Sequence, residues 1–150
     1  MHQFKFYNPV KILFGPGQIA NVAANIPQGS KVMLVYGGGS IKKNGIYAQV
    51  TQALSGFEYV EFPGVEANPK YETLMKAVEL VRKEKVDFLL AVGGGSVIDG
   101  TKFIAAATYF EGEDPYVICT ERARIGKALP LASVLTMPAT GSEMTCGGVI

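Results

Sequence analysis

The tetrapeptide Gly-Gly-Gly-Ser occurs twice in this chain, at residues 37–40 and 93–96. A glycine-rich turn in front of a helix exposes backbone amides to a phosphate group, and the positive end of the helix dipole adds to the attraction. Three glycines also remove every Cβ atom from the turn, so its backbone can adopt a positive φ and lie against a bulky anion. The serine would cap the helix or bind the phosphate itself. Both turns therefore predict a phosphate-bearing ligand.

A plain strand-to-helix connection is the alternative, but one glycine often suffices for it, and three exceed what a turn needs. Asp99 and Lys102 follow the second turn at helical spacing, so both would lie on one side of a helix near its ligand end. An exposed ion pair is the alternative for these two residues. The helix around them is largely apolar, which favours a buried pair beside a ligand.

The first turn carries a charge signal of its own. An NAD-preferring site places an acidic side chain after its second strand, where it binds the adenosine ribose. Here that position is glycine, and Ser40, Lys42 and Lys43 follow it. These side chains would bind or neutralise a 2′-phosphate, which an acid would repel. The pattern predicts a preference for NADP; the alternative is that the two lysines merely solvate the start of a helix.

The elements that must position these residues alternate along the chain. Apolar or alternating runs predict strands at residues 31–36, 57–62, 86–92 and 129–137, the third of them buried on both faces. Helical periodicity predicts helices at residues 46–54, at 71–85 and directly after the second turn. The alternation predicts an α/β fold, a Rossmann-like parallel sheet with helices on both faces. Both glycine turns would then emerge at the carboxyl ends of strands, where such sheets bind ligands.

Three other stretches carry weaker signals. Residues 4–14 alternate around Pro9, which predicts two short strands in an edge ribbon. Residues 15–20 match a dinucleotide fingerprint, but no buried strand precedes them and no acid follows at the required distance, so a turn that opens a helix to about residue 26 is preferred. Residues 147–150 are typical of the start of a strand. We therefore expect the N-terminal piece of a longer protein, truncated at its C-terminal edge.

Composition limits the class of protein. The chain has 150 residues, 48% of them hydrophobic, which is enough to form the core of one domain. Its net charge is +1, and neither sign of charge forms a long block, which argues against nucleic acid or membrane surfaces as partners. No apolar run approaches the roughly 20 residues of a membrane span, and no signal peptide is apparent, so a cytoplasmic protein is expected. His2 is the one histidine, and Cys119 and Cys146 form no CxxC pair. A usual zinc or iron site is therefore not expected here.

Five segments together resemble a known family. They are Phe-Tyr-Asn-Pro-Val-Lys-Ile-Leu-Phe-Gly at 6–15, Tyr-Gly-Gly-Gly-Ser-Ile-Lys-Lys-Asn-Gly at 36–45, the pair Asn68 and Pro69, the second turn with Asp99 and Lys102, and Leu-Thr-Met-Pro-Ala-Thr-Gly-Ser-Glu at 135–143. In combination and order they resemble the iron-containing alcohol dehydrogenases, in particular the NADPH-dependent aldehyde reductase and butanol dehydrogenase branch. The resemblance covers the whole chain.

The resemblance implies a dehydroquinate synthase-like N-terminal domain at residues 1–150 that binds NADP(H). A helical catalytic domain beyond residue 150 would hold Fe²⁺ or Zn²⁺ through one aspartate and three histidines. The intact enzyme, expected as a homodimer or larger homo-oligomer, would interconvert small-molecule aldehydes and primary alcohols by hydride transfer while the metal polarises the carbonyl oxygen. These 150 residues alone would bind cofactor without turnover and would contain no catalytic or metal-binding residue.

The resemblance also implies roles within the cofactor site. The second turn would meet the pyrophosphate, Asp99 and Lys102 would face the nicotinamide ribose, and the first turn with its lysines would bind the 2′-phosphate. Thr136 and Thr140, at the end of the last predicted strand, would line the cofactor cleft, although threonine is also a common turn residue. The candidate cofactor-binding residues are Gly37, Gly38, Gly39, Ser40, Lys42, Lys43, Asn68, Pro69, Gly93, Gly94, Gly95, Ser96, Asp99, Lys102, Thr136, Thr140 and Ser142.

Two other functions stand beside this one. A metal-dependent polyol dehydrogenase of the glycerol type, or a dehydroquinate synthase-like enzyme, would share the second glycine turn, but the segment at residues 36–45 argues for the aldehyde branch. A stand-alone nucleotide-binding domain would end at residue 150 without a missing strand. The expected strand at the chain end argues against it.

Overall fold

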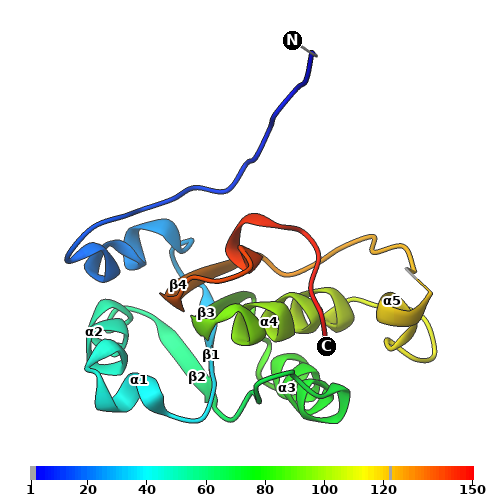
Figure 1. Ribbon diagram of the computed structural model, residues 1–150. Helices are drawn as coiled ribbons and strands as arrows, with labels where there is room; N and C mark the ends of the chain where they lie inside the picture. Colours follow the sequence, from blue (N-terminus) through cyan, green and yellow to red (C-terminus); the bar gives the residue numbers. More distant parts are fainter. Residues whose placement is uncertain (1–2, 122) are drawn as a thin grey trace.

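A computed structural model describes residues 3–121 and 123–150, so His2 lies outside the described residues. Within them, parallel strands form one sheet in the order β2-β1-β3-β4. The strands are β1 (Lys31–Tyr36), β2 (Glu58–Phe62), β3 (Phe88–Gly94) and β4 (Leu131–Met137). The α-helices are α1 (Ser40–Lys43), α2 (Ile46–Ala53), α3 (Tyr71–Glu84), α4 (Gly95–Thr108) and α5 (Val117–Thr120) (Figure 1). Short 3₁₀ helices are η1 (Gln18–Asn21), η2 (Ala23–Asn25) and η3 (Ser142–Met144).

The two central strands are the most buried part of the chain. β1 pairs with both β2 and β3, and β3 pairs with both β1 and β4, all in parallel. Residues 32–36 and 88–93 are buried throughout, because helices cover both faces of the sheet and leave no face for water. The prediction of strands at all four positions is confirmed, as is the parallel α/β fold.

Two apolar cores lie on opposite faces of this sheet. On one face α3 and α4 pack against β1 and β3, with the α3 stripe of Leu74, Ala77, Val78 and Val81 fully buried at helical spacing. On the other face, residues of η1, α1 and α2 pack against the alternate strand residues, such as Leu34 and Leu90. The expected helices on both faces are therefore confirmed (Figure 1).

Three expectations at the chain's periphery are wrong. Residues 4–14 form no strand; this segment leads away from the sheet, with Phe4 88% and Phe14 94% exposed (Figure 1). An alternating sequence becomes a strand only beside a partner, and no described strand pairs with it. Residues 18–25 form two 3₁₀ helices instead of one longer helix. Residues 147–150 form no strand.

Among the described helices, none has the length and apolar character that crossing a bilayer requires.

Candidate functional site

The two glycine turns lie side by side because β1 and β3 are parallel neighbours. Tyr36 pairs with Val92 at the carboxyl ends of these strands, directly before the two turns. In the first turn Gly39 adopts φ +97°, a left-handed conformation that glycine accepts without strain, and α1 begins at Ser40. Gly38 and Ser40 are exposed. The first turn thus presents its backbone and the serine hydroxyl to solvent at the edge where a ligand is expected.

The second turn has a different backbone from the one we expected. β3 runs to Gly94 and α4 begins at Gly95, and none of Gly93, Gly94 and Gly95 has a positive φ. These glycines instead allow close packing: a Cβ atom on Gly93 would lie 2.6 Å from Cγ2 of Val97. The predicted cap is also wrong, since Gly94 is the N-cap and Ser96 lies inside the first turn of α4.

The turn after β4 meets the second glycine turn. A Cβ atom on Gly95 would lie 3.1 Å from Oγ of Ser142 and 3.6 Å from Oγ1 of Thr140. The two hydroxyl oxygens are 3.4 Å apart, and Ser142 is buried. Thr136 is half-buried in β4, and the ladder with β3 passes from Leu135 to Met137 without pairing it. Two of the candidate cofactor-binding residues, Thr140 and Ser142, therefore lie against the second turn.

Asp99 and Lys102 form an ion pair in α4. Lys102 Nζ lies 3.6 Å from Asp99 Oδ1, and each side chain is only 15% exposed, so the alternative of an exposed ion pair is wrong. Both side chains bind the C-terminal segment. Lys102 Nζ donates to the Gly147 carbonyl at 2.6 Å and to Thr145 Oγ1 at 3.1 Å, and Asp99 Oδ2 accepts the Val149 amide at 3.1 Å. Residues 145–149 are thereby fixed against the helix that starts at the second turn.

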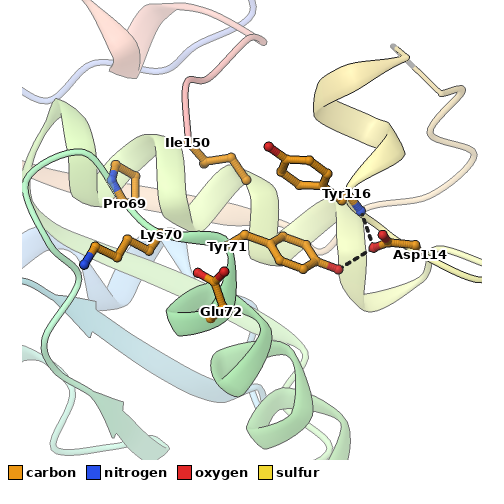
Figure 2. Close-up of a pocket in the computed structure, with 7 residues that line it drawn as sticks. All are labelled: Pro69, Lys70, Tyr71, Glu72, Asp114, Tyr116 and Ile150. Atoms are coloured by element: carbon orange, nitrogen blue, oxygen red, sulfur yellow. Dashed lines mark hydrogen bonds between the residues drawn. The ribbon is translucent and has the colours of Figure 1, made fainter.

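The loop after β2 packs against the same helix. Asn68 has φ +58° and is exposed, while Pro69 is buried against α4, where a Cβ atom on Gly100 would lie 3.5 Å from that of Pro69. Pro69 also lines an open hollow of about 440 Å³ (Figure 2). Of the candidate cofactor-binding residues, it alone lines this hollow. The lining residues are Pro69, Lys70, Tyr71, Glu72, Asp114, Tyr116 and Ile150.

Hydrogen bonds organise one wall of this hollow. The Tyr71 hydroxyl donates to Asp114 Oδ1 at 2.5 Å, and the Tyr116 amide donates to the same oxygen at 2.9 Å (Figure 2). Burial and the bond to Asp114 raise the pKa of Tyr71 to about 12. The two hydrogen bonds in turn hold the pKa of Asp114 below its ordinary value. At neutral pH this wall therefore consists of the neutral Tyr71 hydroxyl, hydrogen-bonded to the ionised Asp114 carboxylate.

A second group of polar side chains lies beside the first glycine turn, and Lys42 is the one member that was predicted from the sequence. Glu61 of β2 accepts the Tyr36 hydroxyl and the Tyr47 hydroxyl, each at 2.6 Å. Lys42 Nζ lies 5.3 Å from the ring centre of Tyr36 and 4.7 Å from that of Tyr47. Lys43 is exposed. We call the set Tyr36, Lys42, Tyr47 and Glu61 the tyrosine–glutamate cluster.

The protonation states in this cluster follow from its hydrogen bonds. The bond to Glu61, together with burial, raises the pKa of Tyr47 to about 12, and burial with the same carboxylate raises that of Tyr36. Partial burial acts to raise the pKa of Glu61, but the two tyrosine hydroxyls lower it overall. The Tyr36 hydroxyl, with a smaller effect of the Glu61 charge, raises the pKa of Lys42. At neutral pH the cluster is one carboxylate, two neutral phenols and one ammonium.

Residues 3–121 and 123–150 do not fit a metal site. No group of three or more His, Cys, Asp or Glu side chains in this part of the chain could hold a metal ion. The amides, hydroxyls and lysines of the two turns can bind and orient an anionic, polar ligand.

Known proteins resemble this chain along its whole length. The sequence model of a family described as iron-containing alcohol dehydrogenase matches residues 9–150. The NADPH-dependent aldehyde reductase YqhD of Escherichia coli K12 is 55% identical over 152 residues, which cover 100% of this chain and 39% of that protein. A probable NADH-dependent butanol dehydrogenase of Bacillus subtilis is 47% identical, again over 100% of this chain and 39% of that protein. This chain thus spans about two fifths of these curated relatives.

The fold comparison agrees with the sequence comparison. A crystal structure of YqhD from Escherichia coli K-12 superimposes with a TM-score of 0.89 at 54% identity, covering 95% of this chain and 37% of that one. The parallel sheet and its helices therefore match the N-terminal part of a solved structure.

Proposed function

Because this chain belongs to the iron-containing alcohol dehydrogenases, we propose that it binds NADP(H) across the carboxyl ends of β1, β3 and β4. The protein that contains it would interconvert aldehydes and primary alcohols. One observation carries the proposal: the two glycine turns follow neighbouring parallel strands, and Thr140 and Ser142 lie against the second turn. Relatives named as an aldehyde reductase and as butanol dehydrogenases support the substrate class.

We assign the pyrophosphate to the second turn. α4 begins at Gly95 and is 14 residues long, so its free amides and dipole both favour an anion at this end. A side chain on Gly95 would occupy the space next to the Ser142 hydroxyl, so glycine keeps the amides and the two hydroxyls close together. The pyrophosphate would then receive donors from α4 and from the turn after β4.

We assign the adenosine 2′-phosphate to the first turn. Position 38 is an exposed glycine, where an acidic side chain would repel this phosphate, and Ser40, Lys42 and Lys43 are exposed beside it. Relatives of this chain are named for either NADPH or NADH. The preference for NADP therefore rests on these four residues rather than on the family.

At the nicotinamide end, Asp99 and Lys102 orient the chain rather than carry out chemistry. Their bonds to Gly147 and Val149 hold residues 145–149 against α4, so this segment would form a wall beside the nicotinamide ribose. The bound cofactor supplies the hydride. We propose that the divalent metal and the substrate-binding groups lie outside these 150 residues, in a helical catalytic domain, and we assign no step of the reaction to them.

Isothermal titration calorimetry of the chain with NADPH and with NADH, at low and moderate salt, tests this proposal. We expect NADPH to bind more tightly, with an advantage that shrinks as salt rises because an exposed phosphate contact is screened. The double variant Ser40→Ala, Lys42→Ala should lose NADPH affinity and keep its NADH affinity. Binding of neither nucleotide by the folded chain, or tighter binding of NADH, would contradict the assignment.

A further inference from the structure

The tyrosine–glutamate cluster contains a carboxylate with both oxygens hydrogen-bonded. Glu61 lies near the carboxyl end of β2, opposite Leu34 of β1, so its side chain lies on the α2 side of the sheet next to Tyr36. Each carboxylate oxygen accepts one short bond from a tyrosine hydroxyl. A carboxylate bound in this way keeps its charge and is held in one orientation. Glu61 is therefore a fixed negative charge beside the first glycine turn.

The charge of this carboxylate acts on Lys42. The ammonium lies over the faces of the Tyr36 and Tyr47 rings, and the same two rings direct their hydroxyls to Glu61. The rings meet edge to face with centroids 6.0 Å apart, so they form one rigid unit between the carboxylate and the lysine. A lysine at an exposed helix end is otherwise free to sample many rotamers. Here its ammonium is held beside the first glycine turn.

We propose that Glu61, through Tyr36 and Tyr47, positions the Lys42 ammonium for the 2′-phosphate of NADP(H), so that cofactor preference depends on a residue that does not touch the cofactor. This inference rests on the proposed function. A lysine that is already ordered loses less entropy when a phosphate binds it.

The test compares NADPH and NADH affinities of Glu61→Gln with those of the unchanged chain. The amide keeps the shape of the side chain but removes its charge, so Lys42 should lose its order. We expect the ratio of NADPH to NADH affinity to fall by about twofold to fivefold, the size of one exposed charge contact, with NADH affinity unchanged. Glu58→Gln is the matched control: it removes a carboxylate of the same strand that pairs with Lys31, and it should leave the ratio unchanged.

A double-mutant cycle shows whether Glu61 acts through the lysine. In a Lys42→Ala background, Glu61→Gln should have no further effect on the affinity ratio. Tyr47→Phe gives an independent readout with the carboxylate intact, since it frees one oxygen of Glu61 to pair directly with Lys42 and should also lower the ratio. It remains informative if Glu61→Gln does not fold.

Each other outcome overturns the proposal. An increase in NADPH affinity in Glu61→Gln would mean that the carboxylate simply repels the phosphate. An equal loss of both affinities would mean that Glu61 only supports the fold, and an effect that persists in Lys42→Ala would exclude the lysine as its intermediary. If the unchanged chain binds both nucleotides but the ratio does not respond, this inference fails and the proposed function stands. If it binds neither, both fail.

Discussion

The two Gly-Gly-Gly-Ser turns are identical in sequence and differ in structure. The first contains a left-handed glycine, Gly39, and leads into the four-residue helix α1 with exposed lysines. The second contains no left-handed residue and leads without a gap from β3 into the 14-residue helix α4. The first turn requires glycine at residue 39 for its backbone conformation, and the second requires it at residue 93 for close packing.

This difference matches two parts of NADP(H), its central pyrophosphate and the 2′-phosphate at its adenosine end. The second turn combines a long helix with two nearby hydroxyls, which suits a pyrophosphate that must be bound closely by backbone amides. The first turn combines a short helix with two exposed lysines, Lys42 and Lys43, the first of which lies against the tyrosine–glutamate cluster. Such a turn suits a terminal phosphate at the edge of the site. The comparison therefore predicts different consequences for glycine-to-alanine substitutions in the two turns.

The largest expected effect is a loss of stability in Gly93→Ala. The added Cβ atom would lie 2.6 Å from Cγ2 and 2.9 Å from Cβ of Val97, so α4 must shift away from β3. Overpacking of this kind lowers the free energy of unfolding by about 1–3 kcal/mol. Urea unfolding of Gly93→Ala and of the unchanged chain measures this loss of free energy. Gly38→Ala, at the second glycine of the first turn, adds a Cβ atom that would meet no atom within 4 Å and should be neutral within about 0.5 kcal/mol. Equal effects at both positions would remove the distinction.

The reverse asymmetry is expected between Gly39 of the first turn and Gly94 of the second. Gly39→Ala forces a Cβ atom into a backbone with φ +97° and should lower the free energy of unfolding by about 1–2 kcal/mol. At Gly94 the backbone φ is −88°, and an added Cβ atom would have Cβ of Met137 as its nearest neighbour at 3.8 Å. Gly94→Ala should therefore change the free energy of unfolding by less than about 0.5 kcal/mol. Thermal unfolding of both variants checks this. A more severe effect at residue 94 would contradict the assignment of strain to the first turn.

A smaller and local effect is expected for Lys102→Met beyond the second turn. The variant keeps the length of the side chain but removes the bonds to Thr145 and Gly147. Amide hydrogen exchange in residues 145–149 should accelerate by about fivefold to tenfold, the equivalent of about 1 kcal/mol of lost hydrogen bonding. Lys43→Met, an exposed lysine beyond the first turn, should leave that exchange unchanged. Unaltered exchange in Lys102→Met would show that the segment is held by other contacts.

The smallest expected effect is a change in alkaline stability near the first turn. The hydrogen bond to Glu61, together with burial, raises the pKa of Tyr47 from 10.0 to about 12, so the folded chain holds this proton more tightly than the unfolded chain does. The stabilisation is complete below pH 10 and is lost as the pH rises towards about 12. Tyr47→Phe should reduce this loss in urea unfolding followed across that pH range. An identical alkaline loss in the variant would contradict the hydrogen bond to Glu61.

Most of the fold could be predicted because its signals are local. The runs that form β1 and β3 are apolar without interruption, and α3 repeats its buried residues at helical spacing, so each element is specified by its own residues. The errors lie where a partner decides the structure. Residues 4–14 have the alternation of a strand but no described neighbour. At the other end of the chain, the Val149 amide is bound by Asp99 rather than by a sheet.

The candidate site was predictable in its outline and not in its details. The two glycine turns meet because their strands are parallel, which the strand and helix alternation already predicts. The tyrosine–glutamate cluster depends on which residues of β1 and β2 lie opposite each other, and this register is set by the whole sheet. A glutamate within a strand was the one available signal for Glu61. Its partner Tyr47 lies 14 residues away in a helix that gives no sign of a polar role.

Amide NMR spectra of the isotope-labelled chain, recorded with adenosine 2′-monophosphate and then with NADPH, test the central claim most directly. The monophosphate carries the 2′-phosphate but no part of the pyrophosphate, so it should shift the amide signals of Gly38, Gly39 and Ser40 and leave those of Gly95 and Ser96 nearly unchanged. NADPH should shift both sets, because its pyrophosphate reaches the start of α4. If the monophosphate shifts only the second turn, or if NADPH shifts neither, the two turns do not divide one dinucleotide between them.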